Sequence, residues 1–148
     1  MPPNLPLPAA PAPLAWRLLA ATYDLLPLLA LWFSGAALGV GLTGGALDVH
    51  RLGDKLLVQS IAIAFTAVYF VVSWVRGGQT IGMKAWRLRV VRSDGRPLGM
   101  ARALLRFAIA TVSLAAVGIG FAWALVDERH RTWHDLAADT VMVRMQKG

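Results

Sequence analysis

Three long stretches of the sequence contain no charged residue, and they point to a chain that folds in a membrane. Leu25 to Leu47, Leu56 to Val75 and Phe107 to Val126 are uncharged over 23, 20 and 20 residues. A helix needs about 20 predominantly apolar residues to cross a bilayer, so each stretch is long enough. Hydrophobic residues make up 57% of the 148 residues and charged residues only 16%, which is unusual for a soluble domain. We therefore expect an α-helical membrane protein of one domain, with apolar segments at about residues 16–43, 56–75 and 107–126.

Basic residues gather between the second and third apolar stretches. From Arg76 to Arg106 the sequence holds eight of the fifteen Lys and Arg residues and a single acid, Asp94. Because basic connectors are retained in the cytoplasm, we expect this connector and the N-terminus to be cytoplasmic. Topology and contact with anionic lipid headgroups account for the net charge of +7, so no nucleic-acid partner is expected.

The connector also has the pattern of a β-hairpin. Apolar and basic side chains alternate from Lys84 to Val91, a turn follows at Ser93 to Gly95, and a return strand is predicted from Arg96. This predicts a small cytoplasmic hairpin over residues 84–98. Its basic side chains are expected to face the membrane surface: Arg87, Arg89, Arg92 and Arg96. An isolated hairpin is only marginally stable in water, so we expect Thr140 to Met145, a third strand-like run, to pair with it.

The first apolar segment carries two charged residues, Arg17 and Asp24. They are seven residues apart, which places them on one face of a helix, two turns or ~10.5 Å apart along its axis. The long Arg17 side chain can extend to the headgroups, whereas ionised Asp24 in hydrocarbon costs ~2.5–3.5 kcal/mol without a partner. Pro27 cannot donate to the carbonyl of Tyr23, so a kink is expected there. Asp24 is therefore either an ion or proton site or one half of a structural pair between helices.

The third apolar segment allows two topologies. A single crossing would place the basic C-terminal residues outside, against the charge rule, and would separate the strand-like run 140–145 from the connector. Gly118 and Gly120 can instead break the segment into two helices that enter and leave the same side, giving four helices in all. We favour this re-entrant pair, which makes the C-terminus cytoplasmic. Arg106, on the entering helix, is expected to be the partner of Asp24.

The two ends of the chain predict a tail and a short helix. Residues 1–13 hold six of the eight prolines, which predicts a disordered tail ahead of a membrane domain at 14–148. Thr132 and Asp135 have the spacing of a capping box, predicting a helix from Trp133 to Ala138. Asp135 is therefore either a helix cap or part of a charged site. The sequence has no cysteine, no catalytic Ser/His/Asp pattern and no phosphate loop, so we expect no enzyme, cofactor or metal site.

Three separated motifs resemble those of the RDD family of small bacterial membrane proteins, named for one Arg and two Asp. They are WRLLAATYD in the first segment, GQTIGMKAWRLRVV with DGRPL in the connector, and RTWHDLAADTVMV near the C-terminus. Arg17 matches the family arginine, and Asp24 and Asp135 match the two aspartates. The resemblance covers Trp16 to Val143. It implies a bacterial inner-membrane protein with several helices and a cytoplasmic face, for which transport is the usual suggestion.

Two functions from different classes are consistent with these residues. The protein could be a small ion- or proton-coupled transporter, or a subunit of one, with a site drawn from Arg17, Asp24, Arg106 and Asp135. The alternative is a non-transporting scaffold or assembly factor in which Arg–Asp pairs lock the helix bundle. A chain of 148 residues has little room for a pathway, so transport is expected to need a homo-oligomer or a larger membrane complex. Gly35 and Gly39 form a GxxxG pattern that permits close helix packing.

Overall fold

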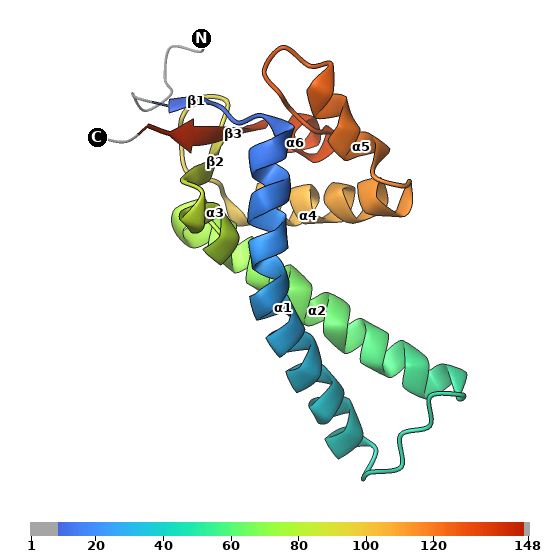
Figure 1. Cartoon of the computed structure of the whole chain (residues 1–148). Helices are drawn as coiled ribbons and strands as arrows, with labels where there is room; N and C mark the ends of the chain where they lie inside the picture. Colours follow the sequence, from blue (N-terminus) through green and yellow to red (C-terminus); the bar gives the residue numbers. More distant parts are fainter. Residues whose placement is uncertain (1–8, 147–148) are drawn as a thin grey trace.

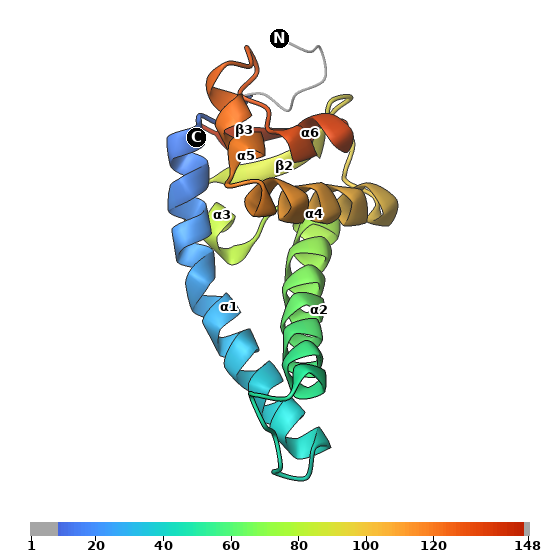
Figure 2. The ribbon, with the colours of Figure 1, turned by 90° about the vertical axis from the view of Figure 1, so that its right-hand side faces the viewer.

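A long helical hairpin sets the length of the molecule in the computed structural model, which describes residues 9–146. Helices α1 (Leu14–Leu42) and α2 (Leu52–Gly77) are joined by a short loop and pack against each other (Figure 1). Both are long and apolar enough to cross a membrane. Figure 2 shows that α1 bends along its length, as expected of a helix that contains Pro27.

Two glycines of α1 let the hairpin close. A Cβ atom added at Gly35 would lie 3.0 Å from the side chain of Ile61, and one at Gly39 would lie 3.2 Å from Val58. The GxxxG pair is therefore used for close packing of α1 on α2 within one chain.

A three-stranded antiparallel sheet joins segments that are far apart in the sequence. Strands β1 (Ala9–Pro11), β2 (Leu88–Arg92) and β3 (Thr140–Met145) are arranged in the order β1-β3-β2. Leu88 is opposite Arg144 and Arg92 is opposite Thr140. The predicted pairing of the connector with the C-terminal run is thus confirmed.

Two other sequence predictions about this sheet are wrong. Within the described part of the chain, residues 93–99 form no strand, so the connector supplies one strand and not a hairpin. Pro97 has no N–H group to donate to a neighbouring strand, which disfavours a strand at residues 96–98. Strand β3 pairs with β2 instead, and its Val141 and Val143 are buried against Val91. The predicted tail 1–13 also extends too far, because Ala9–Pro11 form β1; residues 1–8 lie outside the described part.

The third apolar segment is bent sharply. Helix α4 (Met100–Ala115) is followed by α5 (Ile119–Ala122) and the 3-10 turn η1 (Trp123–Leu125), and the two parts differ in direction by 109°. The left-handed backbone of Val117 and Gly118, with φ of 59° and 74°, makes the break. Figures 1 and 2 both show α4 lying crosswise to α2. The described residues thus hold two helices able to span a membrane, or three if the bent pair counts as one span.

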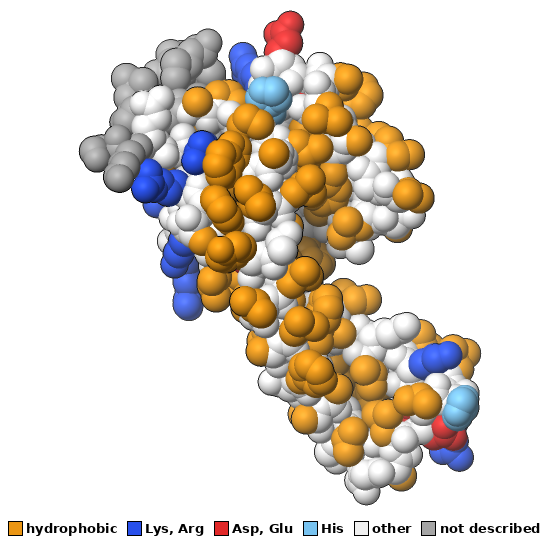
Figure 3. All heavy atoms as spheres, in the orientation of Figure 1, with side chains coloured by type: hydrophobic (Ala, Val, Ile, Leu, Met, Phe, Trp, Pro, Cys, Tyr) orange, Lys and Arg blue, Asp and Glu red, His pale blue; other side chains and the backbone are white. Residues whose placement is uncertain are grey.

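The surface of α4 is reversed relative to a helix of a soluble protein. Leu104, Leu105 and Val112 are exposed, whereas Arg106 and Ser113 are buried. At the bend, Val117 is 93% exposed. Figure 3 shows hydrophobic side chains over much of the helical surface, with charged side chains toward its two ends. An apolar exterior over a polar interior is the arrangement expected where lipid is the solvent.

Two short helices complete the part of the fold that holds the charged residues. Helix α3 (Ile81–Ala85) packs on α1 and leads into β2. Helix α6 (Trp133–Ala137) packs on α4 and leads toward β3. Between them lies a core that includes Trp74, Leu88 and Val90. The segments that carry the family-like motifs therefore meet at one end of the hairpin.

Candidate functional site

Asp135 is fully buried between two arginines that come from different helices. Nη1 of Arg17 donates to Oδ2 of Asp135 at 2.5 Å, and Nη1 of Arg106 donates to Oδ1. The backbone N–H of Thr132 also donates to Oδ2, at 3.0 Å, and the predicted capping box is confirmed. One carboxylate therefore ties α1 and α4 to the start of α6.

The two arginines differ in how completely they are paired. Arg17 is buried, not extended to the headgroups as the sequence suggested, and it also donates to the carbonyls of Ala12 (3.0 Å) and His130 (2.5 Å). Arg106 donates to Oγ1 of Thr140 at 2.8 Å and stacks over the ring of Trp74. Its Nε and Nη2 meet no acceptor among the described residues.

These contacts fix the charge state of Asp135. Burial by itself opposes ionisation of the carboxyl, but Arg106 and Arg17 outweigh burial and hold the pKa of Asp135 well below its usual range. The carboxylate of Asp135 is thus ionised near neutral pH. A cluster of this carboxylate with two arginines is suited to holding helices together and unsuited to exchanging a proton.

His134 lies beside this cluster and is kept neutral. Its ring is buried, Nε2 contacts Oγ1 of Thr132 at 2.8 Å, and Phe121 stacks on it with ring centroids 4.8 Å apart. Burial, reinforced by the charge of Arg106, lowers the pKa of His134 to about 3. His134 is therefore neutral in the folded protein throughout the physiological range.

We expect the protein to lose stability in acid because of His134. An unfolded chain takes up a proton on this imidazole below its ordinary pKa of 6.5, and the folded protein does not until about pH 3. Stability is therefore complete above pH 6.5 and falls as the pH drops, by ~3 kcal/mol at pH 4. Unfolding in detergent at a series of pH values would measure this, and His134→Gln should flatten the profile between pH 6.5 and 4. The matched control His50→Gln, in the exposed α1–α2 loop, should leave the profile unchanged; a flat wild-type profile would contradict the prediction.

Asp24 occupies a separate site, where no basic group of the described residues pairs with it. Asp24 is 3% exposed, and three donors converge on its carboxylate. Oδ1 accepts from the hydroxyl of Tyr69 at 2.6 Å and from the N–H of Gly82 at 2.8 Å, while Oδ2 accepts from Oγ1 of Thr80 at 2.6 Å. The predicted partnership with Arg106 is wrong, because Arg106 is bound to Asp135. No ion pair to Asp24 is formed by the residues that the structure describes.

The backbone of the connector explains why these donors reach Asp24. Thr80 caps α3, accepting from the N–H of Met83 at 3.2 Å, so the helix begins at the carboxylate. A Cβ atom added at Gly82 would lie only 2.0 Å from the carbonyl oxygen of Ala20. Only glycine lets α3 approach α1 this closely. Thr80 and Gly82 belong to the GQTIGM motif, but no pattern in the sequence assigned them, or Tyr69, a role at a site.

The four basic residues assigned to the hairpin differ in their contacts. Arg92 pairs with Asp94 at 2.8 Å, and Arg96 approaches the same carboxylate at 3.8 Å. Nε of Arg89 donates to the carbonyl of Gly77 at 3.2 Å, and Arg87 is exposed.

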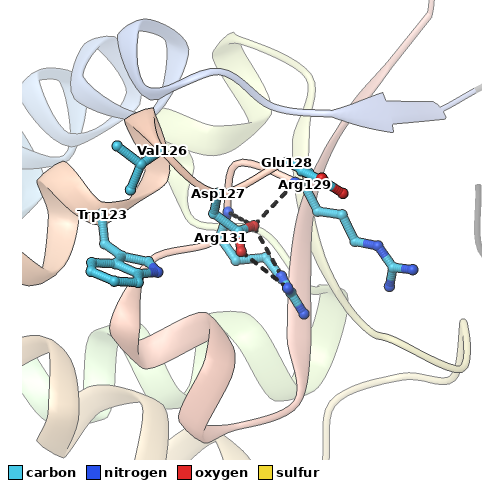
Figure 4. Close-up of a pocket in the computed structure, with 6 residues that line it drawn as sticks. All are labelled: Trp123, Val126, Asp127, Glu128, Arg129 and Arg131. Carbon is cyan, nitrogen blue, oxygen red and sulfur yellow. Dashed lines mark hydrogen bonds and ion pairs between the residues drawn. The ribbon is translucent and has the colours of Figure 1, made fainter.

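A surface cavity of about 510 Å³ lies beside the loop that follows η1. Figure 4 shows the residues that line it: Trp123, Val126, Asp127, Glu128, Arg129 and Arg131. Asp127 forms a two-point pair with Arg131, at 3.1 and 3.0 Å, and this hydrogen bonding lowers the pKa of Asp127 to about 2. Because two acids and two bases balance in the lining, we assign no ligand to this cavity.

Comparison with known proteins identifies the family. Residues 11–139 match the family described as the RDD family. No curated protein and no solved structure matches the chain. The matched range includes Arg17, Asp24 and Asp135. The chain is therefore a member of the RDD family.

Proposed function

We propose that this membrane protein is a small ion- or proton-coupled transporter of the bacterial inner membrane, or a subunit of one, with Asp24 as its exchanging group. The observation that carries the proposal is the setting of Asp24, a buried carboxylate in an apolar helix without a basic partner among the described residues. Intramembrane carboxylates of this kind mark ion and proton pathways. The proposal assigns no catalytic role to any residue.

The neighbours of Asp24 have chemistry suited to exchange. Its two carboxylate oxygens and the hydroxyls of Tyr69 and Thr80 bring four oxygen atoms together, each hydroxyl 2.6 Å from the carboxylate. A hydroxyl can turn from donor to acceptor, so the same group can stabilise a bare carboxylate, a protonated one or a small cation beside it. Binding a proton or cation would weaken the bonds to Thr80 and Gly82 and loosen α3 from α1.

The Arg17–Asp135–Arg106 cluster favours the alternative, a scaffold or assembly factor. Two arginines on one buried carboxylate lock three helices and leave nothing to exchange. In that function Asp24 is a second lock, holding α1 to α2 and α3. The two functions share the fold and differ in whether ions move.

Flux in proteoliposomes tests the proposal. The purified protein should carry a current or pH change that depends on H⁺, Na⁺ or K⁺, and its size in solution should exceed that of a monomer, because two spanning helices enclose no pathway. Absence of flux for all three ions in vesicles that contain folded protein would favour the scaffold.

We further propose that the sheet lies in the cytoplasm and that α4 and α5 enter and leave the same leaflet. Strand β1 precedes α1 and β2 follows α2, so both ends of the hairpin reach one sheet. Strand β3 follows the bent segment and pairs with both of them. A single crossing by residues 100–125 would put β3 on the opposite side from its partners.

Cysteine labelling tests this topology directly, because the chain contains no cysteine. Glu128→Cys and Gln146→Cys should react with an impermeant maleimide only after the cells are opened. Val49→Cys, exposed in the α1–α2 loop, should react in intact cells and serves as the control. Reaction of Glu128→Cys and Gln146→Cys in intact cells would show a third crossing.

A further inference from the structure

A second cavity lies where α2 ends and the chain passes into the sheet. It has a volume of about 320 Å³ and is lined by the last turn of α2, by β2 and by the loop after β2. Its charged lining residues are Arg76 and Arg89, and no acid lines it within the described residues. The cavity is therefore electropositive, unlike the balanced cavity next to Asp127.

Several hydrogen-bond donors around this cavity have no acceptor among the described residues. Arg76 is exposed and makes no ion pair with a described residue. Arg89 uses Nε to bind the carbonyl of Gly77 at 3.2 Å, which orients its guanidinium and leaves the terminal nitrogens available. Trp74 also lines the cavity, is only 6% exposed, and its indole Nε1 has no acceptor in the described part of the chain. Buried donors are rarely left without an acceptor, so the indole N–H of Trp74, beside two guanidiniums that form no ion pair with a described residue, points to a missing anionic group.

The C-terminal end of a helix carries partial negative charge on its free carbonyl groups, and this charge would disfavour an anion near the end of α2. Here that end is capped: the N–H groups of Gly78 and Gln79 donate to the carbonyls of Trp74 (2.9 Å) and Ser73 (3.3 Å). Gly78 adopts the left-handed φ of 68° that this cap requires. The two full positive charges therefore dominate the cavity.

We infer that this cavity binds the phosphate of an anionic phospholipid headgroup. Trp74 and Arg76 end a spanning helix, where headgroups lie, and two guanidiniums with an indole N–H match the oxygens of a phosphate. Val75, Val90 and Leu98 give the cavity apolar walls, which suit the glycerol and upper chains of a lipid better than a free phosphate ion. The inference rests on the membrane placement of α2 in the proposed function and is independent of ion transport.

Lipid binding to the detergent-solubilised protein, measured by native mass spectrometry, tests the inference. Phosphatidylglycerol should bind more tightly than phosphatidylethanolamine, and Arg76→Gln with Arg89→Gln should weaken phosphatidylglycerol binding about tenfold or more. Lys84→Gln with Arg96→Gln removes the same charge from exposed positions outside the cavity and should change binding by no more than about twofold. Equal losses in the two double variants would overturn the site in favour of a diffuse charge effect.

Two further measurements test whether the indole N–H of Trp74 contributes to binding and whether the ligand is a lipid and not a free phosphate ion. Trp74→Phe removes the indole N–H but keeps a ring beneath Arg106, and the folded variant should bind phosphatidylglycerol about threefold more weakly. Inorganic phosphate at millimolar concentration should not displace the lipid. Displacement would mean that the ligand is a free phosphate. Equal binding of the two lipids, which both carry a phosphate, would mean that the net negative charge of the headgroup is not recognised; either result overturns the inference. Because Asp24 is untouched in these variants, a loss of lipid binding is distinguishable from a failure of ion transport.

Discussion

Replacing Asp135 with Asn is expected to lower the free energy of unfolding by about 3–5 kcal/mol. The substitution keeps the shape of the side chain and removes the charge that two buried arginines share. Arg106 is 0% exposed and has no other carboxylate within the described residues, so its charge would be left uncompensated. Denaturant unfolding in mixed micelles would measure the loss, and a large fall in melting temperature should accompany it.

Two variants make this result specific. Asp139→Asn removes a carboxylate four residues away that pairs with Arg102 on the surface at 3.2 Å, and it should cost no more than about 1 kcal/mol. Adding Arg106→Gln to Asp135→Asn removes one of the two buried positive charges that have lost their carboxylate, and it should recover part of the free energy of unfolding. If Asp135→Asn unfolds within about 1 kcal/mol of the wild type, the cluster is not a lock.

The main features of this fold can be predicted from the sequence because they depend on local pattern. The two helices able to span a membrane follow from apolar runs long enough to cross a bilayer, and the capping box follows from the spacing of Thr132 and Asp135. The β2–β3 pairing follows from matched alternation in two runs that need partners. Each of these inferences depends on residues within one short segment of the sequence, or on two segments whose alternating patterns match.

The partner of Arg106 could not be predicted in the same way. A pair between Arg106 and Asp24 would require α4 to run into the membrane beside α1. In the structure α4 lies across the end of the hairpin, so the buried face of α4 meets α6 instead. The direction of a helix after a turn depends on tertiary packing, which periodicity does not report. The prediction that Arg17 extends to the headgroups failed for a related reason, because its partner, Asp135, is 118 residues away in the sequence.

The donors to Asp24 could not be predicted from the sequence either. Two of them, Thr80 and Gly82, come from the start of a five-residue helix in the connector, and one of those two donates from its backbone. A backbone N–H has no signature in the sequence. Gly82 was the one residue whose type hinted at a close contact. The structure explains why it is glycine, because a Cβ atom there would collide with the carbonyl of Ala20.

Asp24→Asn is expected to abolish ion flux while leaving the protein folded. Since Asp24 has no arginine partner in the described structure, removing its charge strands no buried cation, unlike the change at Asp135. An amide still accepts one or two of the three hydrogen bonds, so the cost in stability should be about 1–3 kcal/mol. The flux in proteoliposomes should fall to the level of empty vesicles, because an amide neither takes up a proton near neutral pH nor neutralises a cation.

Tyr69→Phe is the matched control for this variant. It removes one donor to the same carboxylate, with a comparable cost in stability, but leaves the charge of Asp24 in place. If Asp24 exchanges ions, Tyr69→Phe should retain flux, whereas Asp24→Asn should have none. If both variants lose flux only in proportion to the protein that unfolds, Asp24 is a structural lock. Unchanged flux of H⁺, Na⁺ and K⁺ in a folded Asp24→Asn protein would remove Asp24 from the pathway, because no carboxylate would then be left at the site to carry charge.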